Sequence, residues 1–211
     1  MSAFGNRMIC PALNWIPAHA PPDLFSSALA HFQGVPWTAS LLSKPDVIPF
    51  IPNCRNPSSP DLDQFLGNTL RTDNALRHML CFFEKDEHFA DPNKPITKLT
   101  TLFSLGPGLS GVPHVLHGGM TMSMADEAMG ALTELNAELA KQGEAFQTGS
   151  VTGTLEIKFL RAIPVGTDIV ATAWIESVER RKTTIKCEFR DEDGEELARC
   201  QSIWVAVKSN L

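Results

Sequence analysis

The sequence predicts an α+β domain in which one long central helix is wrapped by a curved, mostly antiparallel sheet of five to six strands. Two observations carry this prediction: a long helical apolar pattern begins at a pair of glycines, and four alternating apolar segments follow it. Helices and strands of this kind bury their apolar faces against each other. Residues 1–74 are expected to form an irregular Pro-rich N-terminal extension with short helices, and residues 75–211 the domain itself.

The composition is typical of a globular protein. With 211 residues, of which 43% are hydrophobic and 20% charged, the chain can bury a sizeable core. The formal net charge of −6 argues against a nucleic-acid partner, because phosphate binding requires a basic surface. No run of about 20 apolar residues is present, so no membrane span is expected.

Five cysteines without a C-x-x-C pair indicate the reduced thiols of an intracellular protein. We therefore expect a cytoplasmic location. The lack of acidic residues before Asp23 is a feature shared with transit peptides, so a mitochondrial location is the alternative.

The first 60 residues contain ten of the fifteen prolines and are expected to be largely irregular. A short helix is predicted from Asp23, because five apolar residues after it share one helical face: Leu24, Phe25, Ala28, Leu29 and Phe32. The segment Ser59-Pro60-Asp61 is a second helix-start signal. The extension has too many aromatic residues for a free linker, so we expect it to pack on the domain or to cover its groove.

Alternating patterns place the strands of the domain. Residues 78–83 and 97–105 are expected to form a hairpin with a long loop. The long helix runs from Gly119 to a stop at Gly143 and has a core-facing apolar stripe. Four further strands are expected after it, at residues 154–159, 168–178, 183–190 and 197–207.

Gly118 and Gly119 stand where the long helix starts. Glycine permits backbone angles and close approaches that other residues exclude. The first N–H groups of a helix have no intrahelical acceptor, so they point at whatever lies beyond the helix end. Such an end stabilises negative charge, either on a phosphate or on the oxyanion of an acyl transfer.

Asp126 lies about two turns into the same helix, given 3.6 residues per turn. Its stripe contains small and flexible residues, namely Gly119, Met122, Ser123 and Gly130. This pattern is consistent with a carboxylate that faces a confined space. The neighbouring Glu127 points about 100° away. Both acids could equally serve only to complement the positive end of the helix dipole, so the spacing alone leaves both interpretations open.

The segment His117-Gly118-Gly119, followed by six residues and Asp126, resembles the active-site signature of hotdog-fold acyl-CoA thioesterases. The resemblance is to the PaaI-type group, including the human mitochondrial long-chain acyl-CoA thioesterase branch. Residues 152–164 resemble the strand that follows the central helix in that family, and the similarity in order covers roughly residues 75 to 208. It implies the hotdog fold and an enzyme that hydrolyses an acyl-CoA, or a carrier-bound acyl group, to free acid and thiol.

The resemblance also implies catalytic roles. Asp126 matches the carboxylate that acts as nucleophile or as general base on water. A backbone N–H of Gly118 or Gly119 would polarise the thioester carbonyl, and His117 would position the loop or contact the acyl carbonyl region. Thr152 matches a hydroxyl residue that orients water, although the gap of 26 residues after Asp126 is long for the family. An ordinary strand residue is the alternative for Thr152.

Substrate contacts are expected from five further residues: Met122, Ser123, Glu127, His114 and Arg161. The methionine suits an adaptable acyl groove, and the arginine lies near a strand end where it could meet the phosphates of coenzyme A. Glu127 is also the rival of Asp126 for the catalytic role.

Gly111 departs from the family pattern, because some relatives carry an Asn at this position, six residues before the His. His114 could replace that Asn. His114 and His117 are spaced as two metal ligands could be, but no third ligand has suitable spacing, so no metal is expected. No cofactor is implied beyond coenzyme A as part of the substrate.

Relatives place their sites across a subunit interface, so the resemblance implies a homodimer or a dimer of dimers. Three alternatives remain for the function. The first is a non-catalytic acyl-binding or interaction protein on the same fold. The second is a product-releasing partner of a polyketide or fatty-acid synthase. The third is a hotdog hydratase, for which the sequence contains no matching motif.

Overall fold

The computed structural model describes residues 5–87 and 89–207. Three α-helices, α1 to α3, and nine strands, β1 to β9, are connected by short 3-10 or π-helical turns. The helices are α1 (Leu24–Gly34), α2 (Pro36–Leu42) and α3 (Gly118–Glu138). The strands are β1 (Val47–Phe50), β2 (Leu76–Glu84), β3 (Lys98–Leu105), β4 (Ser110–Val112), β5 (Val115–Leu116), β6 (Ser150–Phe159), β7 (Asp168–Glu179), β8 (Lys182–Arg190) and β9 (Glu196–Ala206).

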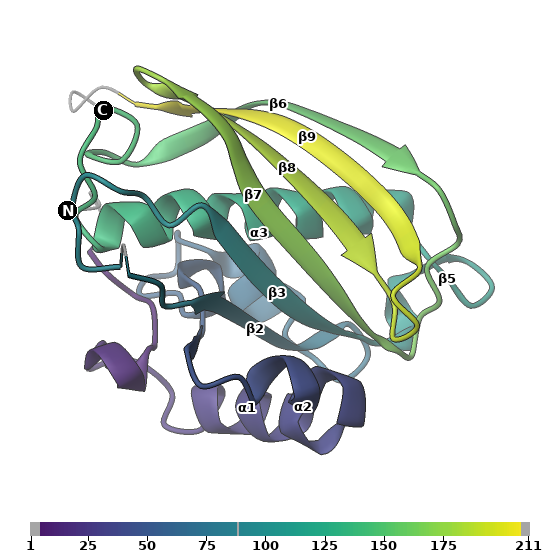
Figure 1. Ribbon diagram of the computed structural model, residues 1–211. Coiled ribbons are helices and arrows are strands. Elements are labelled where there is room, and N and C mark those ends of the chain that lie inside the picture. Colours follow the sequence, from purple (N-terminus) through teal and green to yellow (C-terminus); the bar gives the residue numbers. More distant parts are fainter. Residues whose placement is uncertain (1–4, 88, 208–211) are drawn as a thin grey trace.

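Seven of the strands form one antiparallel sheet in the order β1-β2-β3-β7-β8-β9-β6, which curves around α3 (Figure 1). This arrangement confirms the predicted long helix wrapped by an antiparallel sheet. The sheet has one strand more than expected, because the extension adds β1 to the edge of β2. The opposite edge is β6, which pairs with β9 along one side.

The core lies between α3 and the concave side of the sheet. Met124, Ala128, Leu132 and Leu135 of α3 are fully buried there. Gly130 allows the helix to approach β9 closely, because a Cβ atom at this position would lie 2.9 Å from Cη2 of Trp204. Since protein interiors are close-packed, this contact fixes the height and rotation of α3 in the sheet.

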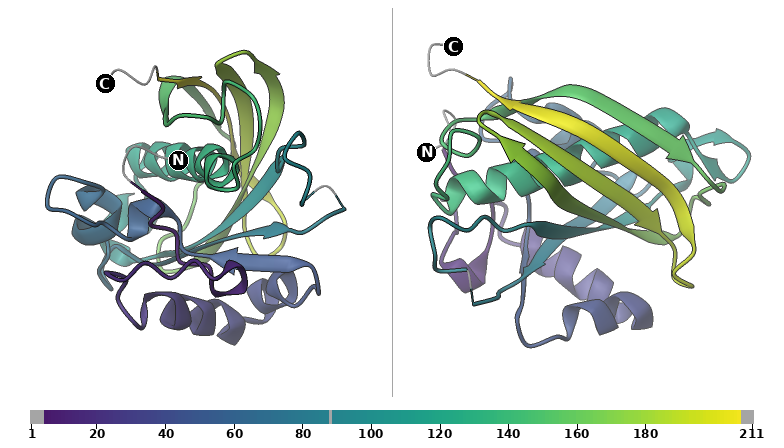
Figure 2. Two further views of the ribbon diagram at one scale, coloured as in Figure 1. Left: turned by 90° about the vertical axis from the view of Figure 1, so that its left-hand side faces the viewer. Right: turned by 45° about the horizontal axis from the view of Figure 1, so that its top comes forward.

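The extension packs on the domain, as its aromatic content indicated. Helices α1 and α2 lie against the convex side of the sheet (Figure 2), where Phe32 of α1 is buried with Leu80 and Leu102. The chain then forms β1 and continues below α3, where Cys54 and Leu66 join the main core. The extension therefore shares the hydrophobic core of the domain.

Two predicted helix boundaries differ from the structure. The helix expected from Ser59 is a single π-helical turn, Phe65–Thr69. Asp63 has a φ of 54°, a left-handed conformation that interrupts a right-handed helix before it can form. Helix α3 ends at Glu138, earlier than Gly143, because Ala140 also takes a left-handed φ of 53°. Among the described residues, no helix has both the length and the apolar character needed to cross a membrane.

A histidine cluster attaches α1 to the sheet. The Nε2 atom of His31 lies 3.1 Å from both carboxylate oxygens of Asp168, at the start of β7. The ring of His31 stacks on His78 of β2, with 4.5 Å between the ring centroids. Burial, followed by repulsion from His31 and Arg77, lowers the pKa of His78 to about 4. His78 is therefore neutral at physiological pH.

Substitution of Phe50 by Ala tests whether the extension is part of the folding unit. Phe50 is fully buried and packs edge-on against Phe83, with 6.3 Å between the centroids. Its loss should lower the free energy of unfolding by about 3–5 kcal/mol, measured by denaturant titration. Ile16→Ala is the matched control, since Ile16 is 67% exposed in the same extension. Equal stability of the two variants would show that the extension contributes no core.

The low pKa of His78 gives the stability a pH dependence. Between about pH 4 and the ordinary histidine value of 6.5, the unfolded chain binds a proton that the folded protein does not. The free energy of unfolding should therefore fall as the pH drops through this window. His78→Gln should make this decline shallower, whereas replacement of the exposed His19 should leave it unchanged. A decline of the same steepness in His78→Gln would assign it to other groups.

Candidate active site

The start of α3 presents one free backbone donor. His117 is the N-cap, and its Nδ1 atom accepts a hydrogen bond of 3.0 Å from the Gly119 N–H. The N–H groups of Met120 and Thr121 bond to the carbonyl of His117. Within the described part of the chain, the Gly118 N–H has no hydrogen-bond acceptor. Of the two glycines expected as carbonyl donors, Gly118 is therefore the one whose N–H is available.

Gly111 provides the space that His117 occupies. A Cβ atom at residue 111 would lie 2.9 Å from Cδ2 of His117 and 3.0 Å from its Cα. An Asn side chain at this position is incompatible with the observed position of the His117 ring. His114, expected as its substitute, is exposed in the turn between β4 and β5 with a φ of 63°. No hydrogen bond of the His114 side chain occurs among the described residues.

An apolar pocket of about 410 Å³ opens beside Gly118. Its walls come from β5 and from residues 159–163, which follow β6. The Phe159 ring lies directly over Gly118, because a Cβ atom on Gly118 would be 3.2 Å from the ring Cζ. Arg161 stands at the pocket and forms an exposed ion pair of 2.6 Å with Glu195. The free N–H of Gly118 thus borders a cavity that is mostly apolar.

Asp126 and Thr152 meet where α3 faces β6. The Thr152 hydroxyl donates a hydrogen bond of 2.6 Å from Oγ1 to Oδ1 of Asp126. The pairing of β6 with β9 shifts between Thr152 and Thr154, around Gly153. Irregularities of this kind re-aim side chains at a sheet edge. The gap of 26 residues is therefore compatible with contact, because the loop between α3 and β6 takes up the extra length.

The other residues expected at the site have different environments. Ser123 donates to the Gly119 carbonyl over 3.1 Å within the helix, and the neighbouring Met122 is exposed. Glu127 faces the extension, where it hydrogen-bonds with the Cys54 thiol. Burial raises the pKa of Glu127 to about 7. Glu127 thus lies away from the Asp126–Thr152 pair, as its angle of about 100° along the helix requires.

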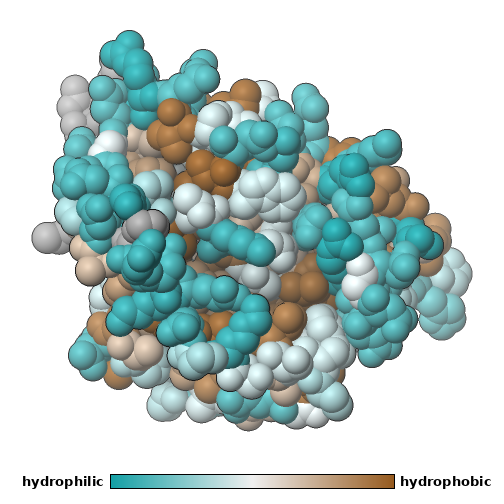
Figure 3. Space-filling model, viewed as in Figure 1, coloured by the Kyte–Doolittle hydropathy of each residue, from teal (hydrophilic) through white to brown (hydrophobic). Residues whose placement is uncertain are grey.

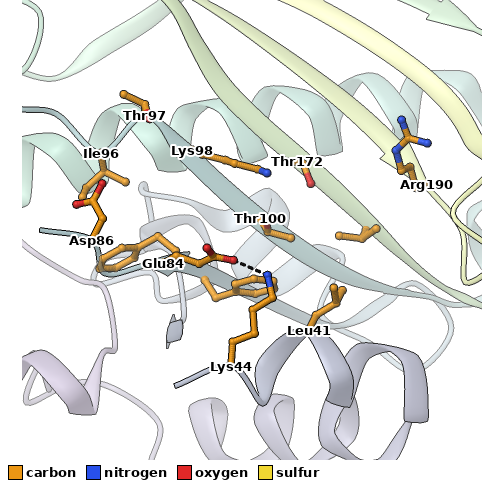
Figure 4. Close-up of a pocket in the computed structure, with 13 residues that line it drawn as sticks. Leu41, Lys44, Glu84, Asp86, Ile96, Thr97, Lys98, Thr100, Thr172 and Arg190 are labelled. Atoms are coloured by element: carbon orange, nitrogen blue, oxygen red, sulfur yellow. Dashed lines mark hydrogen bonds and ion pairs between the residues drawn. The ribbon is translucent and has the colours of Figure 1, made fainter. Parts of the chain in front are cut away.

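A second cavity, of about 390 Å³, lies on the convex side of the sheet next to α2 (Figure 4). Lys44 and Glu84 form an ion pair of 2.6 Å at one side, and Lys98, Thr172 and Arg190 line the sheet. The sheet separates this cavity from α3. None of the site residues expected from the sequence lines it, so size alone does not mark the candidate active site.

Two residues of the site region were not expected from the sequence. Phe159 fits the alternating pattern of a strand, so the pattern alone assigns it to the core, yet it is 51% exposed beside Gly118. Glu134 lies two helical turns after Glu127 and faces the same part of the extension. The spacing of seven residues between these acids was a usable signal for Glu134. Nothing in the local sequence indicated that the face they share is covered.

Gly111→Ala tests the packing at the start of α3. The added Cβ atom would collide with both the ring and the backbone of His117, so the N-cap must shift. We expect a loss of about 1–3 kcal/mol in the free energy of unfolding. Gly34→Ala is the control, because no atom lies within 4 Å of the Cβ position there. A loss no larger than that of the control would show that the loop adjusts freely.

Comparison with known proteins agrees with this geometry. A family model described as "Thioesterase superfamily" matches residues 114–198. Verlamelin biosynthesis protein B of Lecanicillium sp is 27% identical over 165 residues, which cover 67% of this chain and 71% of that protein. Acyl-coenzyme A thioesterase THEM4 of Bos taurus is 32% identical over 111 residues, which cover 53% of this chain. The PaaI protein of E. coli, from the phenylacetic acid degradation operon, has 18% identity and a TM-score of 0.45, with coverage of 53% of this chain and 73% of that one.

The matched region spans only 41% of the length of the Bos taurus thioesterase. The family match nevertheless runs from the turn before α3 into β9, and so it contains His117, Asp126 and Thr152. The match and the helix wrapped by its sheet confirm the resemblance seen in the sequence. The chain therefore carries a hotdog-fold domain of the thioesterase superfamily.

Proposed function

We propose that this protein is a thioesterase that hydrolyses an acyl-CoA, or an acyl group on a carrier, to the free acid and the thiol. The observation that carries the proposal is the 2.6 Å hydrogen bond between Thr152 and Asp126, on a helix whose first N–H groups include a free donor at Gly118. The matching relatives named acyl-coenzyme A thioesterases support the same chemistry. The five cysteines are free and buried, which supports the expected cytoplasmic location.

Each group has a distinct role in the proposed reaction. The Gly118 N–H donates to the thioester carbonyl oxygen and stabilises the negative charge that develops there. Asp126 accepts a proton from water, and the resulting hydroxide adds to the carbonyl carbon. Collapse of the tetrahedral intermediate breaks the C–S bond, and the departing thiolate takes up the proton. Because Thr152 donates to Asp126, its oxygen lone pairs are free to accept a hydrogen bond from the water and orient it.

The helix geometry favours a site shared between two copies of the chain. Gly118 and Asp126 are eight residues apart in α3, which separates them by about 12 Å along the helix axis. This distance is too long for one carbonyl to contact the Gly118 N–H while its carbon is attacked by a water held on Asp126. A second copy that supplies the other group resolves the mismatch, so we propose a homodimer, alone or within a dimer of dimers.

Strand β6 is the surface that we propose for the dimer contact. It is an edge strand, so one row of its backbone N–H and C=O groups is available for pairing with another strand. Val151 and Phe159 of β6 are 54% and 51% exposed, and Met122 of α3 is 37% exposed nearby in the fold. Antiparallel pairing of two β6 strands would place the start of one α3 helix alongside Asp126 of the other.

Thiol release from short, medium, long and aromatic acyl-CoAs tests the proposal. Asp126→Asn should reduce kcat by about 10²–10⁴-fold, the usual contribution of a general base. Thr152→Val should reduce it by about 10- to 100-fold, because a hydrogen bond to a charged group is lost. Glu179→Gln is the control, since Glu179 is an exposed acid at the far end of β7.

The outcome for the wild type decides between the alternatives. Hydrolysis that is insensitive to Asp126→Asn would assign the reaction to another group. Release from an acyl carrier protein but not from coenzyme A would favour a synthase partner. Silence with both substrates, together with acyl-CoA binding in calorimetry, would favour the non-catalytic binding protein.

A further inference from the structure

Helix α3 carries a stripe of acids on the face that the sheet leaves uncovered. Glu127, Glu134 and Glu138 follow one another at spacings of seven and four residues, so they share this face. All three are at least partly buried. Acidic side chains are almost never buried without a partner. The cover comes from the segment of the extension that follows β1.

Two adjacent residues of the extension hold two of these carboxyl groups. The Asn53 Nδ2 donates to Oε2 of Glu134 over 3.1 Å, and its Oδ1 accepts from the Arg7 backbone N–H over 3.0 Å. Cys54, next in the chain, hydrogen-bonds with Glu127. Because both residues lie in one short 3-10 helix, Asn53–Arg55, they grip α3 at points two turns apart.

The charges around this contact do not compensate a carboxylate. Arg7 is a nearby cation, but it is ion-paired with Asp63. Arg55 donates to the carbonyls of Leu66 and Arg77 and points away from α3. The other titratable groups that face the contact are acids or thiols: Asp63, Asp126, Glu138, Cys54 and Cys81. Among the described residues, neither Glu127 nor Glu134 forms an ion pair with a cation.

Burial in these surroundings favours the protonated acids. It raises the pKa of Glu127 to about 7 and that of Glu134 to about 8. Both values lie above the ordinary glutamate value of 4.5, so the folded protein binds more protons than the unfolded chain between these limits. The stabilising contacts are therefore complete at low pH and are lost as the pH rises through about 7 and 8.

A polar cavity of about 200 Å³ adjoins the contact and is bordered by Arg7, Asn53, Glu134 and Ser150. Its volume could hold about six water molecules at the density of the liquid. Such water can solvate a carboxylate that forms there. Ser150 also links the cavity to the site, because its hydroxyl lies 2.9 Å from that of Thr133 and it begins β6, two residues before Thr152.

We propose that Glu127 and Glu134 are positioning residues: in their protonated forms they fix α3 to the extension and so hold Asp126 against Thr152. When they ionise, the contacts with Asn53 and Cys54 weaken and α3 gains freedom relative to β6. The extension thereby acts as a pH-sensitive brace beneath the catalytic helix. The consequence for catalysis rests on the proposed function, but the brace itself does not.

Hydrogen exchange of the full chain tests the brace without any substrate. We expect the protection of residues 50–58, corrected for the intrinsic exchange rate at each pH, to fall by at least about tenfold between pH 5.5 and pH 9. Glu127→Gln/Glu134→Gln should keep its protection at pH 9, because the amide is neutral and can still bond to Asn53. Glu179→Gln should behave like the wild type.

Two results would overturn the proposal: equal protection of the wild type at both pH values, or an equal loss in the double variant. If the double variant does not fold, Glu134→Gln alone decides, since it should retain more protection at pH 9 than the wild type. For an active enzyme, kcat should decline above pH 8 in the wild type and less in the double variant, with little change in KM. Absence of hydrolysis would refute the proposed function and leave the exchange result to judge the brace.

Discussion

The fit of α3 inside the curved sheet is the constraint on which the rest of the structure depends. Gly130 lets the helix approach Trp204 closely, and this contact sets the rotation of the whole helix. Once that rotation is fixed, Asp126 must face β6 while Glu127 must face the extension, because neighbouring residues diverge by about 100°. The two acids therefore have opposite environments: one meets a hydroxyl at an open edge, and the other is buried beneath a cover.

The two ends of the proposed chemistry are separated by the same helix. The backbone donor stands at its first residue and the carboxylate two turns further on, so a single chain offers both groups but not to one substrate. An exposed edge strand lies beside them. The incomplete site and the unpaired edge are consistent consequences of one design, in which a second copy completes both the sheet and the site.

The extension links both sides of the sheet to the catalytic helix. Its first helices cover the convex face, β1 lengthens the sheet, and the following turn closes the open face of α3. The first contact depends on apolar burial and on the His31–Asp168 pair, and the last on neutral carboxyl groups. These interactions respond to pH in opposite senses: acid protonates the histidine cluster, whereas alkali ionises the buried glutamates.

The sequence by itself determined the fold class, the long helix and the residues of the signature, because hydrophobic periodicity and the glycine pair are local properties of the chain. It also put Thr152 forward despite its long separation from Asp126. Tertiary structure alone decided that Gly118 has the free N–H, since His117 folds back onto Gly119, and that Gly111 makes room for this ring. It also decided that Phe159 is exposed and that Glu127 and Glu134 are covered. Burial depends on which distant segment packs over a residue, and the left-handed residues Asp63 and Ala140 direct that path without any apolar pattern to reveal it.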